Sequence, residues 1–172
     1  MLNTLLPNII RFAGLILLQV LVLDKMHIHQ LVHPYIYPLF ILLLPFATPG
    51  WITLLLGFLL GIFIDIFSDT LGLHAAATVL MAYFRPAVLS IITPNSGYDT
   101  DIKPKMGHMG FIWFVTYSAI FVSVHHIAFF MLEVFSLSNF LLMIQRISIN
   151  IAISIALMLL YEFVFYARRS RI

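Results

Sequence analysis

Long apolar segments, separated by short polar connections, make up almost the whole 172-residue chain. Charged residues account for only 9% of it and hydrophobic residues for 62%. A soluble domain carries about 25% charged residues, so this chain cannot cover a water-facing surface. The sequence therefore predicts an integral membrane protein.

The apolar segments divide the chain into about six predicted helices. A bilayer crossing takes roughly 20 residues, which leaves no room for a separate soluble domain. We expect one polytopic membrane domain over residues 1–172, built as an all-α bundle because helices satisfy their own backbone groups in hydrocarbon. The expected helices are 2–23, 31–48, 52–67, 73–93, 111–134 and 140–166, and the main polar loop is 94–110.

The second segment is the weakest helix of the six. It contains Pro34, Pro38 and Pro45, and at 1.5 Å per residue it is barely long enough to cross. It is therefore expected to be kinked or re-entrant. Charge does not separate five crossings from six, and length alone favours six.

Basic residues set the predicted orientation. With both termini in the cytoplasm, only Lys25 falls on the outer side. The residues on the inner side are Arg11, Lys103, Lys105, Arg168, Arg169 and Arg171. This imbalance predicts a cytoplasmic C-terminus. The basic residues are too scattered for a nucleic-acid surface.

Chemistry-bearing motifs are scarce. The chain has no cysteine, which excludes disulfides and thiolate sites. Phosphate-binding, hydrolase, zinc-protease and dinucleotide fingerprints are absent from the sequence. We expect neither an enzyme nor a bound cofactor.

The most specific pattern lies in the third segment, where Gly57, Gly61 and Asp65 recur every four residues. They share one helix face, and the two glycines allow a neighbouring backbone to approach closely. A carboxylate on that face is costly unless it is paired, hydrated or protonated. Asp65 is open to three interpretations: a cap or snorkelling group at a close-packed helix pair, a contact for an external partner together with Asp69, or part of an ion pathway.

This stretch, Gly-x3-Gly-x3-Asp followed by Leu71-Gly72 and Ala75, resembles the rod shape-determining protein MreD family of the bacterial cell-elongation machinery. Chain length, short loops and the Arg-rich C-terminal end are similar in outline. About twenty residues carry the likeness specifically.

The resemblance implies a multi-pass protein of the bacterial inner membrane that binds the shape-determining protein MreC. It also implies a role in coupling the cytoplasmic MreB filament to peptidoglycan synthesis. The helical arrangement would be similar to the substrate-binding subunits of energy-coupling-factor transporters, and no catalytic residues are carried over. The proline-rich second segment and the His-rich first connector depart from the family pattern.

A second polar pattern joins the last two predicted helices. Arg146, Asn150 and Ser154 form a stripe at four-residue steps, which should face the bundle interior. The preceding helix offers Ser123, His126 and Glu133 roughly on one face. A short connection makes the two helices antiparallel neighbours, so Arg146 should reach Glu133 as an ion pair. A proton or substrate relay is the alternative.

The remaining polar residues have structural interpretations. His125 and His126 are adjacent, so they point to different sides of a helix and do not predict a metal site. His27, His29 and His33 are expected to be solvated, and Arg85 before Pro86 is expected to be an interface anchor. The polar stripe leaves a small-molecule carrier, or substrate-binding transporter subunit, as the alternative function.

Overall fold

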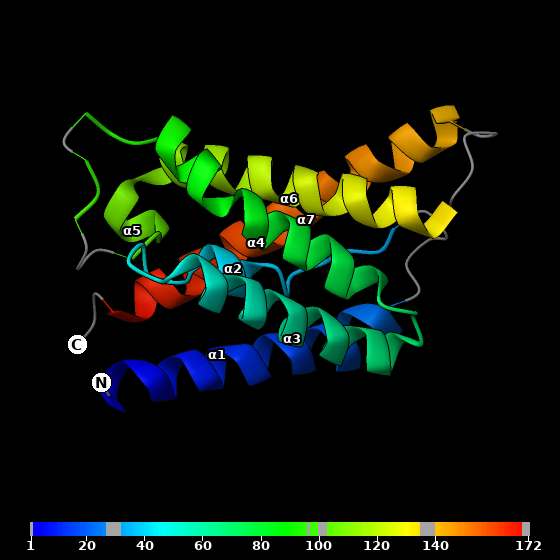
Figure 1. Ribbon diagram of the computed structural model, residues 1–172, viewed down its shortest axis with the longest axis horizontal. Coiled ribbons are helices and arrows are strands. Elements are labelled where there is room, and N and C mark those ends of the chain that lie inside the picture. Colours follow the sequence, from blue (N-terminus) through cyan, green and yellow to red (C-terminus); the bar gives the residue numbers. More distant parts are fainter. Residues whose placement is uncertain (1, 27–31, 96, 100–102, 135–139, 170–172) are drawn as a thin grey trace.

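The computed structural model is a bundle of long helices (Figure 1). It describes residues 2–26, 32–95, 97–99, 103–134 and 140–169. The long helices are α1 (Leu2–Leu21), α3 (Gly50–Ser68), α4 (Leu73–Ile91), α6 (Phe111–Val134) and α7 (Phe140–Arg169). Shorter elements are the 3-10 helix η1 (Leu23–Lys25) and the four-residue helices α2 (Leu39–Leu42) and α5 (Met106–Met109).

Five helical stretches are long and apolar enough to cross a membrane. They are Leu6–Lys25, Gly50–Ser68, Leu73–Ile91, Phe111–Val134 and Phe140–Phe165. The all-α membrane class expected from the sequence is therefore supported, with five such helices among the described residues.

The bundle has two distinct ends (Figure 1). At one end, here named the Lys105 end, lie both chain termini and the loop between α4 and α6. At the opposite end, named the Asp69 end, α3 turns into α4. Lys103 and Lys105 thus lie far from Lys25, which follows the last turn of α1.

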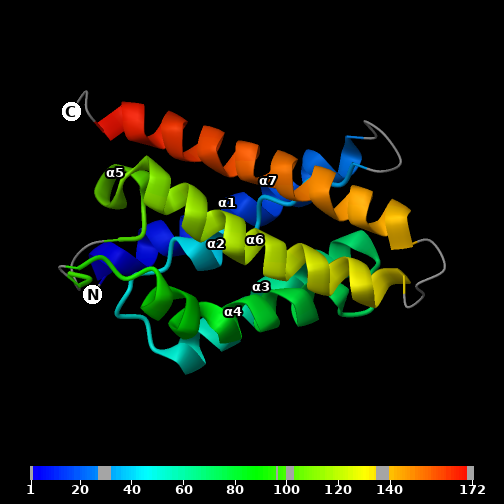
Figure 2. The same ribbon diagram turned by 90° about the horizontal axis from the view of Figure 1, so that it is seen from above.

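The prediction of a second helix over 31–48 is wrong. Residues 32–48, here named the central segment, are mostly extended and contain only the short helix α2. Pro34 and Pro38 offer no backbone N–H, and each disfavours helical geometry in the residue before it. The segment passes through the middle of the bundle from the Asp69 end to the Lys105 end (Figure 2).

Burial explains how an irregular segment is tolerated there. Residues 34–44 are all buried, and Tyr37, Leu39 and Ile41 have no exposed surface. Non-helical backbone survives at membrane depth only where protein surrounds it. The central segment is therefore the core around which the long helices pack.

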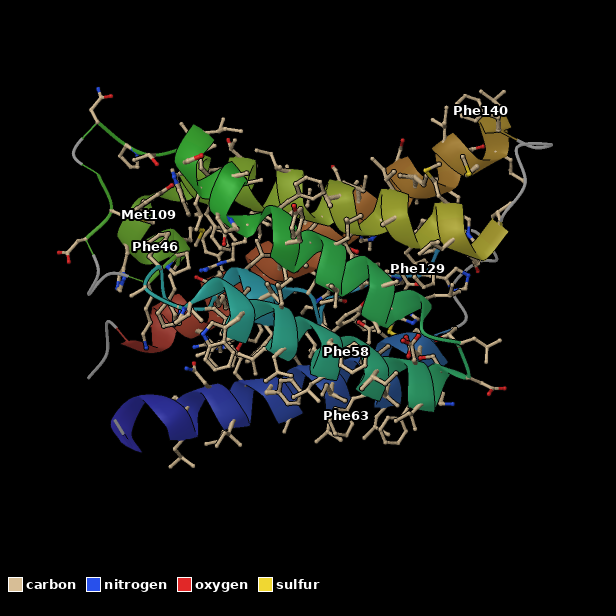
Figure 3. The ribbon with its side chains drawn as sticks, in the orientation of Figure 1. Phe46, Phe58, Phe63, Met109, Phe129 and Phe140 are labelled. Atoms are coloured by element: carbon tan, nitrogen blue, oxygen red, sulfur yellow. The ribbon has the colours of Figure 1, made fainter. Side chains whose placement is uncertain are left out.

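The long helices form that surrounding wall. α4 packs against α3 on one side and α6 on the other, and α6 also contacts α7. Outward positions carry large apolar side chains such as Phe67, Ile91, Ile112 and Leu141, as a lipid-facing surface requires. Figure 3 shows Phe129 of α6 toward the Asp69 end and Phe46 and Met109 at the Lys105 end.

Helix boundaries agree with the sequence within a few residues, apart from the second segment. α4 ends at Ile91 rather than Thr93, and the polar loop holds the extra helix α5. The expected connector histidines His27 and His29, the connection 136–139 and Arg171 lie outside the described residues.

Candidate functional site

The closest helix contact in the motif is made at Gly61 on α3. A Cβ built there would lie 2.3 Å from the Cα of Ala75 and 2.5 Å from its N on α4. Gly57 is less constrained, since its Cβ would lie 3.3 Å from Ala82 Cβ and from the Thr78 carbonyl oxygen. Gly61 therefore admits no side chain, and α3 and α4 touch backbone to backbone.

Asp65, one turn further along α3, caps α4. Its Oδ2 accepts the backbone N–H of Ala75 at 2.9 Å, and its Oδ1 accepts the backbone N–H of His74 at 3.0 Å. Thr70 Oγ1 and His74 Nδ1 also donate to Oδ1. The first N–H groups of a helix lack partners within it, and its positive dipole end favours an anion.

Burial decides between the cap and the partner contact as interpretations of Asp65. The residue is 3% exposed and both carboxylate oxygens are occupied within the protein. It is the cap of a close-packed helix pair and has no surface to offer to a partner. The sequence did not lead us to His74 as a partner of Asp65, although a histidine at the start of the following helix could have indicated this contact.

The exposed part of the motif is the turn between α3 and α4. Asp69 adopts a left-handed conformation (φ 55°) at the end of α3, and Gly72 follows with φ 86°. Asp69 is exposed, and Leu71 between them is fully exposed. Asp65 of α3 binds the first N–H groups of α4 next to this turn, and so fixes the position of the turn at the Asp69 end.

The polar stripe of α7 faces inward, and its first member pairs with α6. Arg146 Nη1 lies 3.1 Å from Glu133 Oε2, so the spacing correctly placed these two side chains together. The guanidinium also lies over the Phe130 ring, 4.8 Å from its centroid. The ion pair is partly exposed, at the Asp69 end of the two helices.

The next two members of the stripe bind the central segment. Asn150 Oδ1 accepts the backbone N–H of His33 at 2.6 Å, and Ser154 Oγ accepts that of Tyr35 at 2.9 Å. Residues two apart in an extended chain are about 6.6 Å apart and present their N–H groups on the same side. Residues four apart on a helix are separated by about 6 Å, so the two repeats match.

His126 completes this contact. Its Nδ1 lies 2.9 Å from the Val122 carbonyl oxygen, which fixes the proton on Nδ1 because a carbonyl only accepts. Its Nε2 then accepts the Ser154 hydroxyl proton over 3.1 Å. Ser154 thus donates to His126 and accepts from Tyr35, and both of its hydrogen-bonding roles are filled.

Gln19 of α1 holds the other edge of the extended stretch. Its Oε1 accepts the Ile36 N–H at 2.9 Å, and its Nε2 donates to the Pro34 carbonyl at 3.1 Å. Side chains on two helices therefore replace the neighbouring strands that an extended segment would have in a sheet. Gln19 is fully buried, and sequence reasoning missed it although it interrupts an apolar helix.

At the Lys105 end of the central segment, backbone carbonyls accept hydrogen bonds from side chains of the surrounding helices. The last carbonyls of a helix lack partners within it, and cations favour that end. Around the end of α2, Tyr117 donates to the Leu42 carbonyl at 3.1 Å, and Arg11 donates to that of Leu43 at 3.3 Å. Arg85 Nη2 donates to Leu44 at 2.6 Å and to Pro45 at 3.2 Å.

The interpretation of Arg85 as an interface anchor is therefore wrong. Its side chain is 3% exposed and lies against the central segment. The sequence could not reveal these carbonyl acceptors, because they exist only once residues 32–48 are irregular and buried.

A cluster of aromatic and histidine side chains fills the bundle toward the Asp69 end. Tyr37 Oη and His125 Nε2 are hydrogen-bonded, and Tyr35 packs within 6 Å of the rings of His74, His125, His126 and Phe129. Among the described residues, no three His, Cys, Asp or Glu side chains gather closely enough to hold a metal ion. The cluster is a packed core in which His125 Nε2 bonds to Tyr37, while His125 Nδ1 is buried without a hydrogen-bond partner among the described residues.

Comparison of the chain with family models, with curated proteins and with solved structures gave no match.

Proposed function

We propose that this protein is a non-enzymatic inner-membrane component of the bacterial cell-elongation machinery, of the MreD type. It binds an MreC-like single-span protein and helps couple the MreB cytoskeleton to peptidoglycan synthesis. It is a multi-pass protein whose C-terminus lies in the cytoplasm. The resemblance of the Gly57–Ala75 stretch to that family is the basis of the proposal.

One structural observation carries it: the buried polar groups of the motif and of the stripe bind the chain's own backbone. Asp65 caps α4, and Asn150 and Ser154 hold the central segment. A scaffold needs such internal fixation, because it presents a surface of constant shape without reacting or opening.

The surface we assign to the partner is the α3–α4 turn at the Asp69 end. It combines the exposed acidic residue Asp69 with the exposed apolar residues Phe67 and Leu71. Gly57, Gly61 and Asp65 serve this surface indirectly, by fixing α3 against α4 beneath it.

A carrier function draws less support. A carrier needs a cavity with convergent polar groups. The inner positions of the polar stripe are engaged by His33 and Tyr35 backbone, and the rings of Tyr35 and Tyr37 fill the space beside them. Uptake activity is nevertheless an outcome that the following experiment distinguishes.

The experiment measures capture of an MreC-like protein in detergent and the shape of the host cells. Leu71→Glu places a charge on a fully exposed side chain, so the fold should persist while capture falls. Met26→Glu is the matched control, because Met26 is 47% exposed, follows η1 at the same end and lies outside the apolar helical stretches. Capture is normalised to the amount of folded protein.

The scaffold proposal expects lost capture and rounded cells for Leu71→Glu, and neither change for Met26→Glu. Equal capture by both variants and wild type would show that the turn is not the partner surface. Intact capture and shape with loss of an uptake activity would favour the carrier.

A further inference from the structure

A groove of about 630 Å³ runs between α1 and α7 toward the Lys105 end. Its α1 wall extends from Leu6 to Leu18, and its α7 wall is formed by Tyr161 and Phe165. The twelve residue steps from Leu6 to Leu18 make this groove about 18 Å long, which is close to the length of a fatty acyl chain. The groove is open on one side, as a site entered from the membrane must be.

The packing of the bundle explains why this groove exists. α1 packs on α3 and on the central segment, whereas α7 packs on α6. Gly14 widens the gap further, because a Cβ built there would meet nothing within 4 Å. The groove therefore results from the positions of α1 and α7 and from the absence of a side chain at Gly14.

The wall of the groove is apolar except for Tyr161 and two cations. Arg11 and Lys105 both line it, from α1 and from the loop before α5. Glu162 lies within electrostatic range of both, and its Oε2 accepts the Met106 N–H at 3.2 Å. Among the described residues at this end of the groove, two cations that line it face one carboxylate.

We propose that this groove binds a lipid that carries an anionic phosphate, with an acyl chain along Gly14 and the phosphate at Arg11 and Lys105. Basic pockets between transmembrane helices are suited to acidic headgroups, and the apolar wall suits the chain. Arg11 sits deeper than Lys105; its Nη1 donates to the Leu43 carbonyl, and its side chain also lines the groove. This lipid site is independent of the partner surface at the Asp69 end.

The test is equilibrium binding of acyl-labelled phosphatidylglycerol to the purified full-length chain in detergent. Gly14→Leu fills the groove and should weaken binding roughly tenfold, since it removes the space for the chain. Ala13→Leu is the matched control, because Ala13 is an exposed neighbour on α1 outside the groove. It should bind as wild type does.

Charge is tested separately from shape. The double variant Arg11→Gln with Lys105→Gln should bind phosphatidylglycerol no better than phosphatidylcholine of the same chains. Lys103→Gln, in the same loop but outside the groove, should keep the preference. Glycerol phosphate, which has the headgroup chemistry without chains, should compete poorly.

Three results would overturn the proposal. Equal binding by wild type and Gly14→Leu would show that the lipid does not use the groove, and full competition by glycerol phosphate would assign the cations to a soluble anion. A crosslink from Gly14→Cys to a partner helix, with lipid binding unchanged in Gly14→Leu, would assign the groove to a protein. Because the binding assay contains no partner protein, its failure leaves the proposed scaffold function untouched.

Discussion

The Ser154 hydroxyl on α7 accepts the backbone N–H of Tyr35 at 2.9 Å, although 119 residues separate them in the sequence. Ser154 also donates to His126 Nε2, so one small side chain joins α7, α6 and the central segment. A buried N–H without an acceptor is costly, which makes this hydroxyl a determinant of the fold.

Ser154→Ala should therefore lower the free energy of unfolding by about 1–3 kcal/mol, because it leaves the Tyr35 N–H without its acceptor and His126 without its donor. Denaturant titration in detergent measures the change. Ser90→Ala is the control, since the Ser90 hydroxyl is exposed and bonds to the Ala87 carbonyl within its own helix. Equal losses in the two variants would contradict the assigned role.

The ion pair between Arg146 and Glu133 predicts a coupling in a double-mutant cycle. Arg146→Ala leaves a partly buried carboxylate unpaired and removes the contact with Phe130. It should therefore destabilise the bundle more than the double change with Glu133→Ala. The expected coupling is about 1 kcal/mol, because both side chains retain some exposure to solvent. Additive losses would show that the pair contributes nothing.

The sequence predicted the five long helices and the ion pair because both depend on local periodicity. The close approach at Gly61 follows from glycine spacing, and the pairing of Arg146 with Glu133 follows from a short connection. These features need only the geometry of neighbouring helices.

The central segment was not predictable in the same way. Its three prolines indicated that a helix would be interrupted. They did not indicate an extended conformation, which is stable because Gln19, Asn150 and Ser154 supply its hydrogen bonds. These three side chains come from helices at opposite ends of the sequence. Arg85 was misinterpreted for the same reason, since its acceptors belong to that segment.

A series of glycine substitutions tests the helix packing. Gly61→Ala should cost about 3 kcal/mol, because its Cβ would overlap the Ala75 backbone and force α3 and α4 apart. Gly57→Ala should stay within about 1 kcal/mol of wild type, since the contact at 3.3 Å opposes the gain in helix propensity. Gly14→Ala meets no neighbour and should be neutral or stabilising.

Unfolding in detergent gives the order of the three variants. A Gly61→Ala protein as stable as Gly14→Ala would mean that α3 and α4 do not approach at this point.

Asp65→Asn tests the cap separately from the close packing. An asparagine keeps one acceptor but places an amide opposite either the His74 or the Ala75 N–H, so at least one bond is lost. The expected loss is about 1–2 kcal/mol, and Asp65→Ala should exceed it because neither N–H then has an acceptor. Asp69→Asn, at an exposed position, should cost little. Equal stability of Asp65→Ala and wild type would rule out the cap.

The path of the central segment predicts the sidedness of two loops. Between Met26 and Asp99 the chain passes along the bundle three times, through the central segment, α3 and α4. Three crossings put these residues on opposite sides of the membrane, whereas two crossings would put them on the same side. The cysteine-free chain allows single thiols to be introduced at both exposed positions. If the basic residues at the Lys105 end lie in the cytoplasm, an impermeant thiol reagent should label Met26→Cys in intact spheroplasts and Asp99→Cys only after lysis. Labelling of both variants in intact spheroplasts would show that residues 32–48 enter and leave the membrane on one side.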